Sequence, residues 1–180
     1  MNVNLLEMMQ QVVFLVCLFI SFTSLGQTSV PSDFITQNGK TIPVYRFDEF
    51  KPILTPQNDT LYIINFWATW CQPCVAELPY FEQLNDSLKN QKAKIILVSI
   101  DSRKTAETEL IPFIEKKKLK TTVWLLNEPD FNSWLDKVSP DWSGSIPATI
   151  MIKRDVAHFY EQSFEFEQLK LITYQHLNQK

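Results

Sequence analysis

A long apolar run that ends just before a pair of cysteines constrains the fold of this chain more than any other feature. Residues 60–68 are almost continuously apolar, β-branched or aromatic, which predicts a central strand buried on both faces of a parallel or mixed sheet. Cys71 and Cys74 follow at once, and from Val75 onward apolar residues recur every three or four positions. The sequence therefore predicts a buried strand that leads through a Cys-x-x-Cys turn into an amphipathic helix.

Two cysteines at the start of a helix indicate redox chemistry. Free backbone N–H groups and the positive end of the helix dipole stabilise a thiolate there, which lowers the thiol pKa. Cys71 would lie at the accessible mouth of the helix, whereas Cys74 would lie one turn further in, where burial raises a thiol pKa. We therefore expect one thiol to attack a substrate disulfide and the other to release the product, leaving a Cys71–Cys74 disulfide.

Two other interpretations of the cysteine pair stay open at this point. One is a structural disulfide, and the other is half of a metal site. A zinc site needs two further ligands, for which His158 and His176 are the remaining candidates. A covalent haem site is disfavoured, because Val75 and not a histidine follows Cys74.

The first 26 residues have the pattern of a secretory signal peptide, which would leave residues 27–180 as the mature domain. Residues 12–20 form a short apolar core, and Ser24, Leu25 and Gly26 offer small residues for cleavage before Gln27. The alternatives are an uncleaved membrane anchor, because residues 1–11 contain no Lys or Arg, and a lipid on Cys17. After cleavage, Cys71 and Cys74 would be the only cysteines left in the mature chain. A disulfide between them would close a very short loop and so would stabilise the fold little.

Composition limits the classes of partner. The chain has 180 residues, 45% of them hydrophobic, which suits one globular domain with a core of its own. Its formal net charge of −3 provides no basic field for nucleic acid. We therefore expect no nucleic-acid partner, and contact with a membrane only through an uncleaved N-terminal segment.

Strands and helices alternate after the cysteine motif, which predicts a three-layer α/β sandwich. An Asn-Gly pair within residues 34–44 predicts an N-terminal β-hairpin. Residues 46–59 contain Pro52 and Pro56, and we expect them to be irregular. The other expected elements are strands at 94–100 and 121–126, helices at 75–88, 105–118, 131–138 and 165–178, and a hairpin at 148–161.

Three motifs, in this order of elements, resemble the TlpA-like (ResA-like) group of exported thiol–disulfide oxidoreductases. They are residues 65–79 (NFWATWCQPCVAELP), residues 98–101 (VSID) and residues 142–149 (WSGSIPAT), within a similarity that covers residues 34–178. The resemblance implies an α/β thioredoxin fold, with a central mixed sheet flanked by helices and an N-terminal β-hairpin extension. It also assigns Cys71 as the attacking thiol and Cys74 as the resolving thiol.

The resemblance implies further catalytic residues. Glu77 matches a buried glutamate that tunes the cysteines, and the alternative is an ordinary surface glutamate. Pro147 matches a cis-proline that lies against the disulfide, so that the Ile146 backbone could pair with an extended substrate. Asn65 stands where ordinary cytosolic thioredoxins carry a buried aspartate, which favours the envelope group.

The remaining site residues surround the cysteines in the sequence. We expect Trp70, Gln72 and Pro73 to contact the substrate, with Trp67 in the core; the alternative is that both tryptophans are core residues. The resemblance implies no metal and no organic cofactor besides the redox-active Cys71–Cys74 disulfide.

The function expected from these features is the reduction of protein disulfides in the periplasm or cell envelope. Electrons would come from a membrane donor, and cytochrome c maturation is one role within the family. The alternatives are a disulfide oxidase or isomerase, a non-catalytic peptide-binding module of the same fold, and a peroxidase. A peroxidase needs an arginine near the cysteine, but Arg46, Arg103 and Arg154 are all distant from the motif in sequence.

Overall fold

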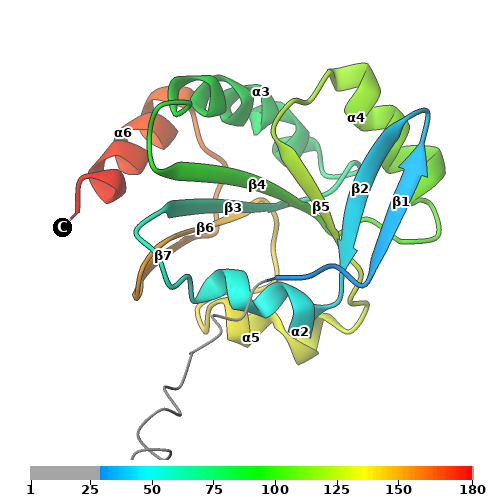
Figure 1. Cartoon of the computed structure of the whole chain (residues 1–180), viewed down its shortest axis with the longest axis horizontal. Helices are drawn as coiled ribbons and strands as arrows, with labels where there is room; N and C mark the ends of the chain where they lie inside the picture. The colour runs from blue at the N-terminus through cyan, green and yellow to red at the C-terminus, as the bar shows by residue number, and fades with distance from the viewer. Residues whose placement is uncertain (1–28, 180) are drawn as a thin grey trace, which may run out of the picture.

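A seven-stranded mixed sheet forms the frame of the protein in the computed structural model, which describes residues 29–179 (Figure 1). The strand order is β1-β2-β5-β4-β3-β6-β7. The expected signal peptide and Cys17 lie outside the described residues. Among helices within residues 29–179, none is long and apolar enough to cross a membrane. The strands are β1 (Asp33–Gln37), β2 (Lys40–Tyr45), β3 (Leu61–Trp67), β4 (Ala93–Ser99), β5 (Thr122–Leu126), β6 (Ala148–Lys153) and β7 (Val156–Tyr160).

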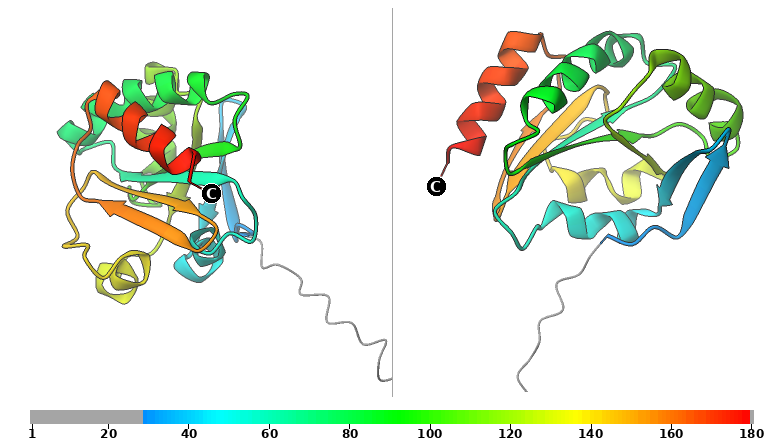
Figure 2. Two further views of the ribbon diagram at one scale, coloured as in Figure 1. Left: turned by 90° about the vertical axis from the view of Figure 1, so that its left-hand side faces the viewer. Right: turned by 45° about the horizontal axis from the view of Figure 1, so that its top comes forward.

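Helices cover both faces of this sheet (Figures 1 and 2). One face carries α3 (Gln72–Ser87), α4 (Ile111–Lys117) and α6 (Phe166–Leu177), with one turn of π-helix, η2 (Ala106–Leu110), leading into α4. The other face carries α2 (Phe47–Phe50) and α5 (Leu135–Val138), which adjoin the 3₁₀ turns η1 (Lys51–Leu54) and η3 (Phe131–Ser133). The three-layer α/β sandwich and thioredoxin-like order predicted from the sequence are confirmed.

Strand β3 is an interior strand of the sheet, between β4 and β6, and lies within the core. It pairs in parallel with β4 from Leu61 to Trp67 and antiparallel with β6 from Tyr62 to Phe66, and all seven of its residues are buried. Successive side chains enter opposite layers: Trp67 packs under α3, whereas Phe66 packs toward α2 and α5. The predicted two-face burial of this run is therefore confirmed.

The N-terminal hairpin extends the sheet beyond β5. Strands β1 and β2 pair antiparallel, and β2 then pairs in parallel with β5 through Val44 and Tyr45. Asn38 and Gly39 both adopt positive φ angles, of 52° and 76°, as a two-residue hairpin turn requires. The N-terminal β-hairpin that the Asn-Gly pair predicts is therefore confirmed.

The prediction that residues 46–59 are irregular is wrong for their first half, which forms α2 and η1. Glu49 Oε2 accepts a hydrogen bond of 2.7 Å from the Arg46 backbone N–H and so closes the first helical turn. Phe50 is fully buried, and its ring centroid lies 5.9 Å from that of Phe66. Pro52 occupies the first turn of η1, where its missing N–H has no helical partner to lose.

Candidate active site

The Cys71–Cys74 disulfide lies where β3 gives way to α3. Cys71 is the N-cap residue of α3, and its Sγ accepts a hydrogen bond of 3.3 Å from the Cys74 backbone N–H. Cys71 retains 6% of its surface exposed, whereas Cys74 is completely buried. A thiolate formed at Cys71 would therefore receive this hydrogen bond and the positive end of the helix dipole. The unequal access of the two sulfurs follows the order expected from the sequence.

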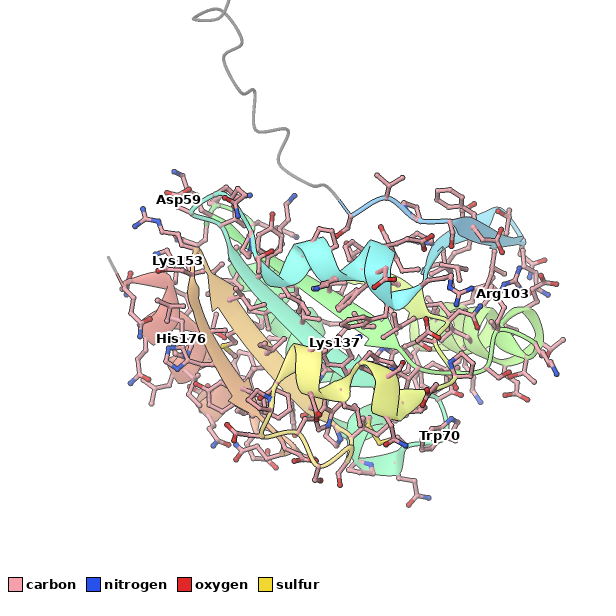
Figure 3. The ribbon with its side chains drawn as sticks, turned by 90° about the horizontal axis from the view of Figure 1, so that it is seen from below. Asp59, Trp70, Arg103, Lys137, Lys153 and His176 are labelled. Atoms are coloured by element: carbon pink, nitrogen blue, oxygen red, sulfur yellow. A yellow bond between two sulfur atoms is a disulfide. The ribbon has the colours of Figure 1, made fainter. Side chains whose placement is uncertain are left out.

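An open rim of residues surrounds Cys71. Trp70 is 66% exposed, and Gln72 and Pro73 are exposed beside it, whereas Trp67 is completely buried. Trp70 thus occupies the surface, and the alternative that both tryptophans are core residues is wrong. Figure 3 shows Trp70 at the edge of the molecule.

The segment before β6 completes the rim. The Ile146–Pro147 peptide bond is cis, as expected, and Pro147 is buried. Ile146 stays partly exposed, and its carbonyl oxygen lies 3.7 Å from Cys71 Sγ. The structure therefore brings Ile146 to the sulfur of Cys71, while the catalytic roles of Cys71 and Pro147 stay predictions.

Glu77 is buried one helical turn beyond Cys74, with 1% of its surface exposed. Its Oε1 accepts a hydrogen bond of 3.0 Å from Asn65 Nδ2, and its Oε2 accepts one of 2.8 Å from the Phe164 backbone N–H. Burial raises the pKa of Glu77 to about 7, against the opposing effect of these hydrogen bonds. The alternative of an ordinary surface glutamate is therefore wrong.

The buried face of α3 differs slightly from the one that the sequence predicts. Val75 was expected on the apolar face but is only partly buried, and Glu77 faces inward instead. The positions that share this face are Cys74, Glu77, Leu78, Phe81 and Leu84. Because polar residues carry no weight in an apolar periodicity, the pattern alone could not place Glu77 there.

Asn65 has a role that sequence reasoning did not assign. Its Nδ2 donates both to Glu77 and, at 3.1 Å, to Thr149 Oγ1 on β6. From the sequence, Asn65 was noted only as a replacement for the buried aspartate of ordinary cytosolic thioredoxins. The structure shows instead a neutral donor that fixes the Glu77 carboxylate without adding a second buried charge.

Asp101 makes contacts that sequence reasoning did not assign, although the motif that contains it was recognised. This carboxylate is buried and accepts hydrogen bonds from the Thr69 backbone N–H at 3.1 Å, from Thr69 Oγ1 at 2.7 Å and from Ser99 Oγ at 2.8 Å. Thr69 directly precedes Trp70 and Cys71 in the chain. Asp101 therefore anchors the segment that leads into Cys71.

The two histidines do not join the cysteines. His158 on β7 and His176 on α6 stack on each other with ring centroids 4.1 Å apart, and Tyr160 Oη lies 2.7 Å from His176 Nε2. Burial and the neighbouring His158 both lower the pKa of His176. Figure 3 shows His176 and Trp70 on opposite sides of the molecule. Across residues 29–179, no group of three or more His, Cys, Asp or Glu side chains is placed to hold a metal ion.

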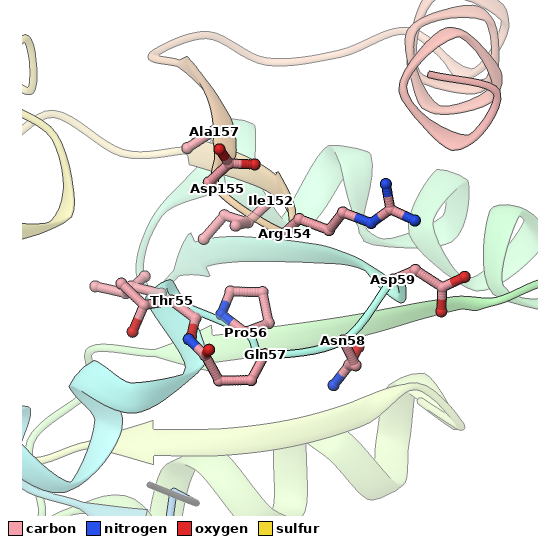
Figure 4. Close-up of a pocket in the computed structure, with 10 residues that line it drawn as sticks. Thr55, Pro56, Gln57, Asn58, Asp59, Ile152, Arg154, Asp155 and Ala157 are labelled. Carbon is pink, nitrogen blue, oxygen red and sulfur yellow. The ribbon is translucent and has the colours of Figure 1, made fainter. Parts of the chain in front are cut away.

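Figure 4 shows a cavity of about 740 Å³ beside the start of β3. It is lined by residues 54–59, which precede β3, and by residues around the β6–β7 turn, including Arg154. Cys71 follows the opposite end of β3, so this cavity has no part in the cysteine chemistry. Arg154 is one of the three arginines that were considered for a peroxidase. The other two form ion pairs, Arg46 with Glu128 and Arg103 with Asp33.

Comparison with known proteins agrees with this geometry. The family model described as AhpC/TSA matches residues 46–158, which is more than half of the chain. The chain belongs to the AhpC/TSA family. The matched residues run from the N-cap of α2 to β7 and include both cysteines, Glu77, Asp101 and Pro147.

Individual relatives are thiol–disulfide oxidoreductases. The chain is 45% identical over 49 residues to the thiol-disulfide oxidoreductase ResA of Oceanobacillus iheyensis, covering 27% of this chain and 23% of that protein. It is 30% identical over 93 residues to the sporulation thiol-disulfide oxidoreductase A of Bacillus subtilis, covering 52% and 51%. The chain thus spans at most about half the length of these two relatives.

A solved structure extends the likeness to the fold. StoA from Bacillus subtilis matches with a TM-score of 0.52 and 24% identity, covering 66% of this chain and 85% of that chain. The recognition of a ResA-like thioredoxin-family chain is therefore confirmed.

The raised pKa of Glu77 predicts a specific pH dependence of stability. A carboxyl group with an ordinary pKa of 4.5 that rises to about 7 on folding binds more protons in the folded state. Its stabilising effect is complete below pH 4.5 and is lost as the pH rises through 7. Between pH 5 and 8, the free energy of unfolding of the wild type should fall by about 2 to 3 kcal/mol relative to that of Glu77→Gln.

Denaturant titrations at several pH values measure this difference. Glu77→Gln carries its own fixed cost, because its amide N–H₂ group meets donors, but that cost does not vary with pH. Glu109→Gln, at an exposed position on η2, is the matched control and should keep the slope of the wild type. Parallel curves for the wild type and Glu77→Gln would show that Glu77 does not titrate in this range.

Proposed function

We propose that this protein is a thiol–disulfide oxidoreductase that reduces protein disulfides through Cys71 and Cys74. The observation that carries the proposal is the disulfide at the start of α3, in which Cys71 keeps 6% of its surface exposed beside an open rim, whereas Cys74 is completely buried, one turn from Glu77. A disulfide with a purely structural role would gain little from a buried ionisable group, such as Glu77, beside it. A redox pair whose second thiol must lose a proton does gain from such a neighbour.

The proposed cycle transfers two electrons in two exchange steps. The Cys71 thiolate attacks one sulfur of the substrate disulfide, forming a mixed disulfide and releasing the other substrate sulfur as a thiolate, which takes up a proton. Cys74 then loses its proton and attacks Cys71 Sγ. The second substrate thiol leaves, and the Cys71–Cys74 disulfide remains. The cycle uses no metal and no organic cofactor.

Glu77 is the proposed acceptor of the Cys74 proton. A base works best near its own pKa, and burial holds the pKa of Glu77 at about 7, close to neutral pH. Hydrogen bonds from Asn65 and from the Phe164 backbone N–H orient the carboxylate. Cys71 remains the nucleophile, because its hydrogen bond from the Cys74 backbone N–H and its place at the helix N-terminus favour a thiolate there.

The proposed substrates are extended segments of protein that carry a disulfide. Trp70, Gln72 and Pro73 offer an exposed rim on one side of Cys71, and the Ile146 backbone lies on the other. An open rim suits a macromolecular substrate better than an enclosed pocket would. Pro147 follows Ile146 through the cis bond and is buried, and we assign it to the support of this binding surface.

The direction and location of the reaction rest on similarity and on the N-terminal sequence. Relatives named ResA and the TlpA-like motif favour a reductase of the periplasm or cell envelope, supplied by a membrane electron donor. Maturation of cytochrome c is one substrate class that would fit. An oxidase or isomerase would use the same atoms in the opposite direction, and only the reduction potential of the pair separates these activities.

Trapping of the mixed disulfide tests the order of the two thiols. Cys74→Ser retains the attacking thiol but cannot resolve the intermediate, so it should accumulate a covalent complex with a disulfide substrate such as insulin. Cys71→Ser, the matched control, should form little or none, and both variants should lose at least about 100-fold in insulin reduction. Mass spectrometry of the adduct separates these thiols from Cys17. Trapping through Cys74 in Cys71→Ser at an equal rate would refute the assignment.

The proposed mature domain begins at Gln27, after cleavage of a signal peptide at residues 1–26. The short apolar core and the small residues Ser24 and Gly26 support this. N-terminal sequencing of protein isolated from native envelope fractions should give Gln27 as the first residue. An intact Met1 in a detergent-extracted fraction would indicate an anchor instead, and lipid on Cys17 would indicate a lipoprotein.

A further inference from the structure

The connection between β7 and α6 reaches back to the rim of the active site. Glu161, the first residue after β7, accepts hydrogen bonds from the Ser143 backbone N–H at 3.1 Å and from the Ser145 backbone N–H at 2.8 Å. The Ser143 hydroxyl donates to the same carboxylate. Residues 143–145 directly precede Ile146, whose carbonyl faces Cys71 Sγ. One side chain thus gathers three donors from the loop that leads to the sulfur.

The inner side of this loop is held by the core. Trp142 is buried, its ring centroid lies 4.7 Å from that of Phe66, and its Nε1 donates to the Ser145 carbonyl at 2.8 Å. The outer side has no such packing, because Ser143 and Ser145 are exposed. Glu161 therefore supplies the outer attachment of a loop whose inner attachment is Trp142.

The charge of Glu161 suits this task. Partial burial alone would raise the pKa of Glu161, but the hydrogen bonds from Ser143 and Ser145 outweigh it and hold that pKa below its ordinary value. The side chain is therefore an ionised carboxylate at neutral pH, which only accepts hydrogen bonds. Charge-assisted bonds of this kind are about twice as strong as neutral ones.

The same connection also touches the cysteine helix. Three residues after Glu161, the Phe164 backbone N–H donates to Glu77, and Glu165 then accepts a hydrogen bond of 3.2 Å from Tyr80 Oη on α3. A segment of five residues, 161–165, therefore contacts the loop on one side of the disulfide and the helix on the other. Residues 161–165 therefore connect the 143–146 loop to helix α3.

We propose that Glu161 is a positioning residue that holds residues 143–146 in the shape that receives an extended protein substrate. This inference rests on the proposed function for its substrate, and on the hydrogen bonds alone for the hold on the loop. Without Glu161, the loop would sample other shapes, and binding of the substrate would have to order it. Substrate affinity should suffer, whereas the sulfur chemistry, which uses Cys71 and Cys74, should not.

Steady-state insulin reduction, with dithiothreitol as the electron source, separates binding from chemistry. In the full-length protein, Glu161→Ala should raise the KM for insulin by about fivefold, the effect of losing one net hydrogen bond, with kcat within twofold of the wild type. Glu161→Gln keeps one carbonyl acceptor, so its KM for insulin should lie between those of the wild type and Glu161→Ala. Glu167→Gln, at an exposed position in the first turn of α6, is the matched control and should behave as the wild type.

Amide hydrogen exchange gives a second result that does not depend on activity. Exchange at the Ser143 and Ser145 amides should become at least about fivefold faster in Glu161→Ala and stay unchanged in Glu167→Gln. Unchanged exchange, or an equal fall in kcat and kcat/KM without a change in KM, would overturn the proposal. If the wild type itself failed to reduce insulin, the proposed function would fall, and the exchange rates would still decide whether Glu161 holds the loop.

Discussion

Pairing of β3 between β4 and β6 is the constraint on which the active site depends. This strand is paired along its whole length with β4 and from Tyr62 to Phe66 with β6, and both of its faces are covered, so its C-terminal end has little freedom. The Ile100 backbone N–H donates to the Trp67 carbonyl at 2.9 Å, and Asp101 then holds Thr69. The sheet therefore fixes the position of Cys71 before any residue of α3 contributes.

Burial then provides the chemical control. In water, a carboxyl group would be ionised throughout the neutral range, but burial on the inner face of α3 brings the pKa of Glu77 to about 7. Asn65, from the middle of β3, adds a hydrogen-bond donor to Glu77 without adding a charge. The cost in stability above pH 7 is the physical reason to regard Glu77 as functional, since a glutamine of similar shape would avoid it.

The parts of this structure that the sequence predicts are those with local signals. The apolar run of β3, the Asn38–Gly39 turn and the cysteine spacing each encode one element or one chemistry over a few residues. Helix α2 was missed because burial of Phe47 and Phe50 against distant aromatic side chains outweighs the nearby prolines. The contacts of Asn65 and Glu161 were missed because their partners lie from 12 to 84 residues away in the sequence, where no periodicity connects them. The burial of Glu77 was expected only from the family resemblance.

The central claim is that Cys71 and Cys74 form a reversible redox couple that reduces other proteins. Equilibration of the protein with dithiothreitol or glutathione buffers of graded potential, followed by counting of free thiols, measures this directly. We predict one reversible two-electron transition, at a potential below about −200 mV, as in other reducing members of this fold. A transition near about −120 mV would make the protein an oxidant, and a pair that cannot be cycled between the two states would contradict the claim altogether.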